Sequence, residues 1–211
     1  MTQRRPSHGS LVRIALVTGA NRGIGFEVCR RLAEKDFVVL LTARDAAKAQ
    51  KAARKLANVG TVEALLLDVG DASSIKKAAN EVARRHGYLD VLVNNAGINY
   101  DTWETAENAE IDGTVVETIR TNLLGSWRAC QAFLPLLRKS KAARIVNVSS
   151  ESGSLAHMGA GPPAYQVTKA ALKCVDPYSR RRTSSRTHSG KRCVPWLGRD
   201  RYGRRWCSSF Y

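Results

Sequence analysis

The chain has 211 residues, of which 44% are hydrophobic and 7% aromatic, a composition typical of a globular α/β protein rather than a disordered or disulfide-stapled one. No apolar run approaches the ~18–20 residues that span a bilayer, and the five cysteines form no CxxC pair, which excludes the usual zinc and disulfide frameworks and favours a soluble, cytoplasmic protein with reduced thiols. The net charge of +16 is uneven, because residues 175–211 hold ten Lys/Arg against two Asp and contribute half of it.

Short apolar runs alternate with longer amphipathic runs from Arg13 onward, which predicts repeated βα units. The expected strands are Ile14–Thr18, Val38–Thr42, Val62–Leu67, Val91–Asn94 and Arg144–Ser149. The expected helices are Gly25–Lys35, Ala46–Asn58, Ser73–His86, Thr114–Lys139 and one that begins near Tyr165. Because crossovers between parallel strands are short and right-handed, this order favours an α/β fold with a Rossmann-like, doubly wound parallel sheet. We therefore expect a flexible N-terminus (1–12), one domain (13–174) and an irregular basic tail (175–211).

A glycine-rich turn follows the first strand. It contains Gly19, Asn21, Arg22, Gly23, Ile24 and Gly25 and leads directly into a helix. The free N–H groups and the positive dipole end of such a helix favour a pyrophosphate, although an ordinary glycine-rich turn remains the alternative. The spacing TGxxxGIG resembles the motif of the short-chain dehydrogenase/reductase family, and further motifs of that family follow in order up to Lys169.

The resemblance implies a nicotinamide cofactor, and the end of the second strand points to NADPH. No carboxylate occupies Ala43, and Arg44 and Arg22 are two cations that can bind the extra phosphate bidentately. The alternative makes Arg44 a solvated residue at a helix entry, with Asp45 as the N-cap.

Two further strand ends match the cofactor motifs of the family. Asp68 and Val69 resemble its adenine-pocket pair, and Asn95, Ala96 and Gly97 belong to an NNAG motif that lines the cofactor. For Asn94, the first residue of that motif, a structural role and a cofactor contact both remain open.

Tyr165 and Lys169 form a YxxxK pair on one face of a helix, so that a lysine ammonium can lower the pKa of a phenol from about 10 and make it a usable acid. The family resemblance implies that Tyr165 donates the proton, that Ser150 polarises the carbonyl, with Ser149 as the alternative, and that Lys169 also holds the nicotinamide ribose. Asn122 matches the asparagine that holds a water next to the lysine; the alternative is a polar residue that bends its helix.

The stretch Ile98–Asp112 most resembles the carbonyl-reductase branch of the family, which implies a small-molecule carbonyl or alcohol substrate and no membrane partner. Tyr100, Trp103, His157, Met158 and Pro163 fall where a pocket wall is expected, and each is open to a packing role instead. A monomer and a homo-oligomer both remain open.

The tail does not continue the family pattern, which requires a sixth strand that ends in a Pro-Gly turn and then a seventh strand. Codons that can encode Val194–Arg205, read one base further along, yield Pro-Gly-Trp-Val-Ala-Thr, and the single codon of Trp196 forces the glycine. We therefore hypothesise a one-base frameshift near codons 174–175. The alternatives are a truncated, inactive family member and a nucleic-acid-binding arm built from Arg and Trp.

Overall fold

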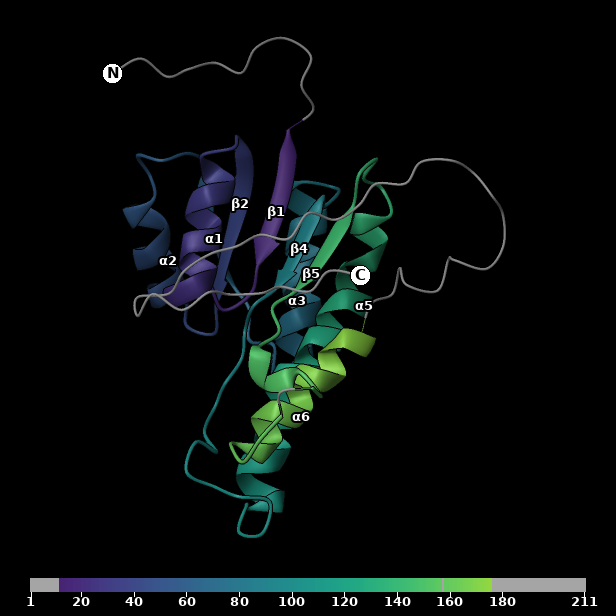
Figure 1. Ribbon diagram of the computed structural model, residues 1–211. Coiled ribbons are helices and arrows are strands. Elements are labelled where there is room, and N and C mark those ends of the chain that lie inside the picture. The colour runs from purple at the N-terminus through teal and green to yellow at the C-terminus, as the bar shows by residue number, and fades with distance from the viewer. Residues whose placement is uncertain (1–11, 157, 176–211) are drawn as a thin grey trace.

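Five parallel strands form one sheet in the order β3-β2-β1-β4-β5 (Figure 1). The strands are β1 (Arg13–Val17), β2 (Phe37–Ala43), β3 (Val62–Leu66), β4 (Val91–Asn94) and β5 (Arg144–Asn147). The computed structural model describes residues 12–156 and 158–175, so the predictions made for residues 1–11, for His157 and for residues 176–211 lie outside it. All five predicted strands and the doubly wound order are confirmed.

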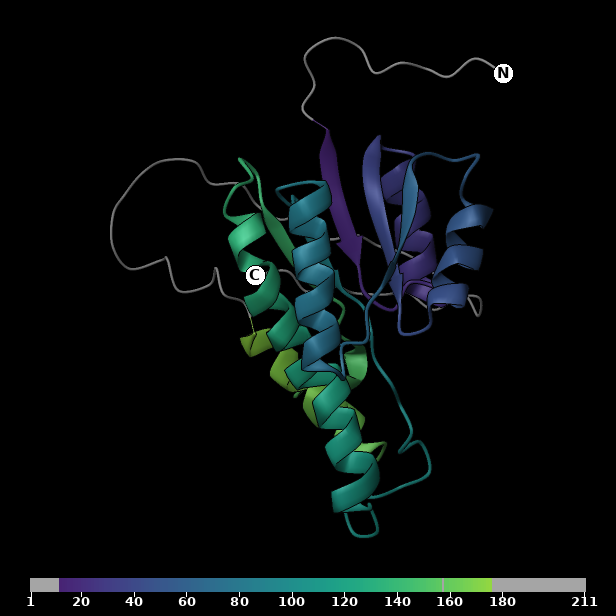
Figure 2. The same cartoon turned by 180° about the vertical axis from the view of Figure 1, so that it is seen from behind.

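Helices cover both faces of this sheet. On one face lie α1 (Gly23–Ala33) and α2 (Ala46–Lys55), and on the other lie α3 (Ala72–Arg85) and α5 (Ser126–Leu137), which Figure 2 shows side by side. The short helical segments are η1 (Ile111–Val115), α4 (Val116–Thr118), η2 (Ile119–Gly125), η3 (Glu151–Gly153) and η4 (Leu172–Cys174), and α6 spans Pro163–Ala171. Because η1, α4, η2 and α5 run on without a break, they form one long helix, as predicted for Thr114–Lys139, which begins three residues earlier than expected.

The core has two halves because successive strand residues point to opposite faces. Leu16, Leu40 and Leu92 pack with Phe133 of α5 on one face. On the other face, Val17 and its neighbours on β2 pack against the small residues of α1 and α2. Helices α2 and α3 begin where the sequence supplies caps: the Asp45 carboxylate accepts from the N–H of Lys48 at 3.0 Å, and the Asp71 carboxylate accepts from the N–H of Ser73 at 2.8 Å.

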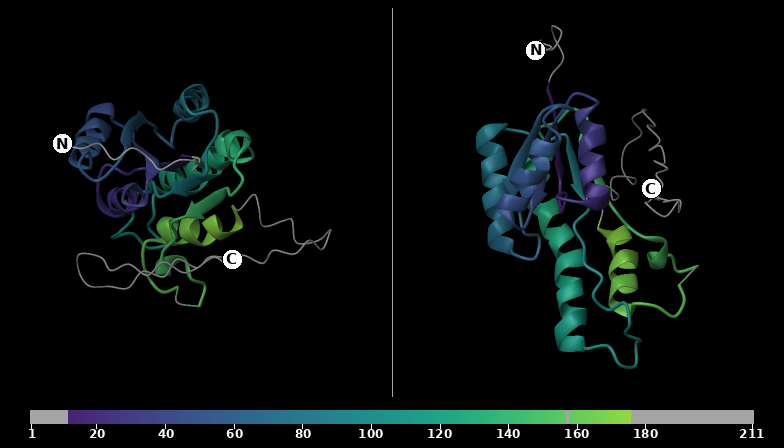
Figure 3. Two further views of the ribbon diagram at one scale, coloured as in Figure 1. Left: turned by 90° about the horizontal axis from the view of Figure 1, so that it is seen from above. Right: turned by 90° about the vertical axis from the view of Figure 1, so that its left-hand side faces the viewer.

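The long helix extends past the carboxyl edge of the sheet, and α6 lies beside its projecting part (Figures 1 and 3). The turns that follow β1 and β4 meet at this edge, because the strand order reverses between these two central strands. Open α/β sheets bind their ligands at such a reversal. The fold therefore brings the predicted motifs to one edge.

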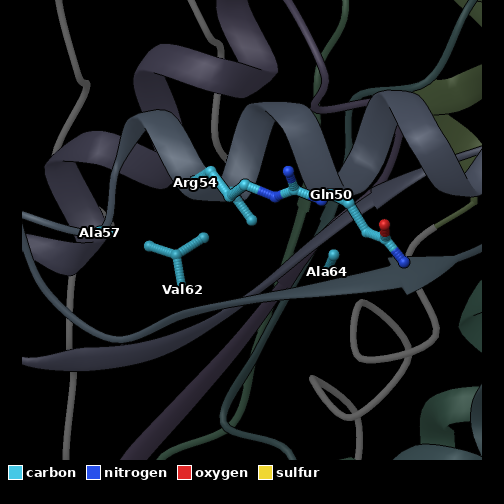
Figure 4. Close-up of a pocket in the computed structure, with 6 residues that line it drawn as sticks. Gln50, Arg54, Ala57, Val62 and Ala64 are labelled. Carbon is cyan, nitrogen blue, oxygen red and sulfur yellow. The ribbon is translucent and has the colours of Figure 1, made fainter.

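A groove lies between α2 and β3, the strand at one side of the sheet (Figure 4). It is lined by Gln50, Ala53, Arg54, Ala57, Val62 and Ala64, none of which was predicted as a site residue. Across the part of the chain that the structure describes, no helix is both long enough and apolar enough to cross a bilayer.

Candidate active site

The glycine turn after β1 is confirmed as a turn with an open helix end behind it. Gly19 and Gly23 have φ angles of +61° and +63°, a conformation that favours glycine. Arg22 is the N-cap residue of α1 but makes no capping side-chain hydrogen bond, and the first helical turn carries no acidic residue. The N–H groups at the start of α1 are therefore left for a ligand. Arg22 and Ile24 are exposed, Asn21 is half-buried, and Gly25 is buried inside α1.

The turn after β4 is tied to the glycine turn by hydrogen bonds. The Asn95 amide donates to the carbonyl oxygens of Thr18 and Gly19 at 2.9 and 3.0 Å. The Thr18 hydroxyl accepts from the backbone N–H groups of Asn95 and Ala96, both at 2.9 Å. The two predicted cofactor motifs therefore form one unit, and buried Thr18, which was not among the predicted site residues, holds them together.

Asn94 connects elements of the sheet and its covering helix. Its amide donates to the Asn147 side-chain oxygen at 2.8 Å and contacts the Cys130 sulfur at 3.2 Å, so that it braces β4 against β5 and α5. Of the two roles left open for Asn94, its contacts support the structural one.

Arg44, predicted together with Arg22 to select NADPH, follows β2, and the predicted adenine-pocket pair Asp68 and Val69 follows β3. Arg44 is exposed directly after β2, and within residues 12–156 and 158–175 neither its guanidinium nor that of Arg22 has a hydrogen-bond or ion-pair partner. Asp68 accepts from the N–H of Gly70 at 2.9 Å, and Val69 is buried in the core. Both arginines are thus available to an anion.

Tyr165, Lys169 and Ser150 come together as predicted. The Lys169 ammonium lies 5.5 Å from the centre of the Tyr165 ring, and the Ser150 hydroxyl is near enough to the Tyr165 phenol to lower its pKa. Ser149 instead donates to the carbonyl oxygen of Lys169 at 2.9 Å. The structure therefore puts Ser150 against the phenol and uses Ser149 to hold α6.

The electrostatics of this group differ from the expectation. Burial raises the pKa of Tyr165, and the neighbouring Ser150 hydroxyl opposes that change without reversing it. Lys169 is only 4% exposed, burial lowers its own pKa to about 8, and its ammonium donates to the carbonyl oxygen of Val148 at 2.8 Å. The expectation that Lys169 lowers the pKa of Tyr165 was wrong, because desolvation of the phenol dominates.

Asn122 links the NNAG segment to α6. Its buried side chain exchanges two hydrogen bonds of 2.8 Å with the backbone of Ile98, and it also donates to the Thr168 hydroxyl at 3.2 Å. A Cβ on Gly97 would lie 3.3 Å from the Asn122 side-chain oxygen and 3.5 Å from the Lys169 nitrogen. Asn122 also lies in η2, a π-helical widening of the long helix, which fits the alternative of a helix-bending residue.

The expected pocket wall is largely exposed. Tyr100, Trp103 and Met158 lie at the surface, with Trp103 92% exposed, and Pro163 opens α6. One residue of the site had no sequence signal: Asp101 is fully buried and contacts the first turn of α6, 63 positions further along the chain. No local sequence pattern predicts a contact between residues so far apart in the chain.

Comparison with known proteins places this arrangement in a family. The chain is 42% identical to the (+)-neomenthol dehydrogenase of Arabidopsis thaliana over 68% of its own length and 55% of that protein. It is 38% identical to carbonyl reductase [NADPH] 1 of Sus scrofa over 76% of its length, again 55% of the relative. The chain thus spans little more than half of these curated relatives.

A solved structure gives the same result for the fold. A metagenomic short-chain oxidoreductase in complex with NADP superposes with a TM-score of 0.70 at 32% identity, covering 77% of this chain and 72% of the other. The family model described as short chain dehydrogenase matches residues 13–176. This chain therefore belongs to the short-chain dehydrogenase family.

Proposed function

We propose that the chain is an NADPH-dependent oxidoreductase that reduces a small-molecule carbonyl to an alcohol. The observation that carries the proposal is the meeting of Tyr165, Lys169 and Ser150 at the carboxyl edge of the sheet, next to Gly97. A proton donor and a hydrogen-bond donor to the developing alkoxide are what this chemistry requires of a protein.

The residues present fit a dinucleotide. Beside Gly23 a Cβ would meet nothing within 4 Å, and this open space adjoins the uncapped first turn of α1, which suits a pyrophosphate. Arg22 and Arg44 are proposed to bind the additional phosphate of NADPH, Asp68 and Val69 to border the adenine, and Asn95, Ala96 and Gly97 to line the rest, with Tyr165 and Lys169 at the nicotinamide ribose. The NADP complex and the NADPH reductase among the similar proteins support this choice. When bound, NADPH supplies the hydride.

Tyr165 is the proposed proton donor. Because burial raises its pKa, the phenol keeps its proton at neutral pH, as an acid must before it transfers that proton to the carbonyl oxygen. Ser150, whose hydroxyl lies near this phenol, is proposed to donate to the same oxygen. The role of Asn122 is proposed to be retention of a water next to Lys169.

The test is NADPH oxidation by the purified full chain with a panel of small aldehydes and ketones, followed by absorbance. We expect turnover with NADPH in preference to NADH, and a loss of ~100-fold or more in kcat for Tyr165→Phe that exceeds its loss of NADPH affinity. Tyr88→Phe is the matched control, because the Tyr88 phenol binds the backbone of Val12 at the other end of the sheet. Equal kcat for Tyr165→Phe and the unaltered chain, or no NADPH binding at all, would refute the proposal.

A further inference from the structure

Helix α6 carries Tyr165 but has no cap of its own. Its N-cap residue is Pro162, which makes no side-chain capping bond, and Pro163 opens the helix without an N–H to donate. The first N–H groups that need an acceptor are those of Ala164 and Tyr165. Both donate to the same carboxylate oxygen of Asp101, at 2.7 and 3.2 Å. The helix is therefore capped from a distant loop.

The position of Asp101 is unusual for a carboxylate. It is fully buried, and its second oxygen has no hydrogen-bond partner within the described residues. Burying a carboxylate is costly unless the group is paired, and here the partners are two N–H groups at the positive end of a helix dipole. The two N–H groups of α6 are thus the only hydrogen-bond partners of this carboxylate among the described residues.

The loop that carries Asp101 is fixed at two points. At one end the backbone of Ile98 exchanges two hydrogen bonds with Asn122, beside Gly97 and Lys169. At the other end Asp101 holds the first turn of α6. The later turn of α6 is held separately, because Ser149 binds the Lys169 carbonyl and a Cβ on Gly153 would lie 2.6 Å from the Lys169 backbone. Lys169 is therefore anchored by the strand end, whereas Tyr165 depends on Asp101.

We propose that Asp101 is a positioning residue, which fixes the first turn of α6 and thereby holds the Tyr165 phenol against Ser150. The role rests on the proposed function, since it concerns the residue that would donate the proton. It also separates the two members of the YxxxK pair: a defect at Asp101 displaces Tyr165 and leaves Lys169 in place.

The test compares Asp101→Ala, Asp101→Asn and the control Asp90→Asn in the full chain. Asp90 is a carboxylate that accepts from the N–H of Ile14 at 2.8 Å, far from α6. We expect Asp101→Ala to lower kcat by ~10–100-fold while the KM for NADPH stays within about twofold. Asp101→Asn retains an oxygen that accepts both N–H groups, so it should keep kcat within about threefold of the unaltered chain. Asp90→Asn should keep its kcat.

Amide hydrogen exchange at Ala164 and Tyr165 gives a second readout that does not depend on turnover. Exchange at both amides should accelerate in Asp101→Ala and stay slow in Asp101→Asn and Asp90→Asn. Faster exchange together with a kcat loss that the Asn variant restores supports the positioning role. An active chain whose kcat is unchanged in Asp101→Ala overturns it, and so does unchanged exchange at the two amides. An inactive unaltered chain instead refutes the proposed function, and the exchange rates then still show whether Asp101 caps α6.

Discussion

At the scale of single residues, the site is governed by the removal of water from Tyr165 and Lys169. Burial disfavours the charged form of both groups: the phenol pKa moves up and the ammonium pKa moves down to about 8. At neutral pH Tyr165 therefore keeps the proton that it would donate, whereas Lys169, with a pKa of about 8, still carries most of its charge. The Val148 carbonyl, which accepts from Lys169, compensates part of the cost of keeping that lysine in the interior.

The lowered pKa of Lys169 predicts a pH-dependent stability. An unfolded lysine titrates near 10.5 and the folded one near 8, so between these values the unfolded state binds more protons and the free energy of unfolding rises with pH. Lys169→Met has no titrating group at this position, so it lacks this rise and avoids the cost of burying a charged lysine. The difference in free energy of unfolding in favour of Lys169→Met should therefore be largest below pH 8 and shrink by about 1.4 kcal/mol per pH unit above it.

Urea unfolding of both proteins at several pH values between pH 7 and 10 measures this difference. Burial raises the pKa of Cys29 to about 12, which costs stability above pH 9, but this residue is common to both proteins and cancels in the comparison. A difference that does not vary with pH would show that Lys169 titrates normally.

At the scale of elements, the sequence predicts what local chemistry determines. Strands from short apolar runs, amphipathic helices and the Asp45 cap follow from neighbours in the chain, and they appear where the pattern places them. The contacts of Asp101 with α6 and of Asn122 with Ile98 join segments 63 and 24 positions apart, so no local pattern encodes them. The prediction of a lowered pKa for Tyr165 was wrong for a related reason. The i, i+4 spacing indicates that Tyr165 lies near Lys169, but it does not indicate how strongly the phenol is shielded from water.

The glycine turn offers a test in which two glycines with similar backbone angles should behave differently. A Cβ at Gly19 would lie 2.8 Å from the Cα of Ala96, whereas at Gly23 nothing lies within 4 Å. Gly23→Ala should therefore lower the free energy of unfolding by only about 1–2 kcal/mol, the cost of a left-handed alanine, and should weaken NADPH binding by filling the open side of the turn.

Gly19→Ala adds a clash with backbone and should cost a further ~1–3 kcal/mol. Thermal unfolding and fluorescence titration with NADPH separate the two effects. Equal destabilisation by both substitutions would contradict the geometry of the turn.

At the scale of the whole molecule, the coverage of the sheet is uneven. Residues Ile14–Val17 of β1 are all buried, whereas every residue of β5 is exposed or only half-buried. Val91, Val146 and Val148 are likewise only partly buried on the face that α1 and α2 cover elsewhere. Because parallel sheets are normally covered on both faces, this margin of the sheet is incompletely protected.

The frameshift hypothesis predicts what would cover that margin. A chain in which residues 175–211 are replaced by the translation of the neighbouring reading frame should unfold at a higher temperature, since full burial of each half-exposed valine contributes about 1 kcal/mol. It should also associate less in light scattering and reduce carbonyls with NADPH faster than the chain with its present tail. A scrambled tail of the same composition is the control, because it keeps the length and charge of residues 175–211.

Sequencing of the transcript across codons 174–175 tests directly whether a one-base frameshift is present. Equal melting temperature and equal activity for the present and the replaced tail would remove the hypothesis.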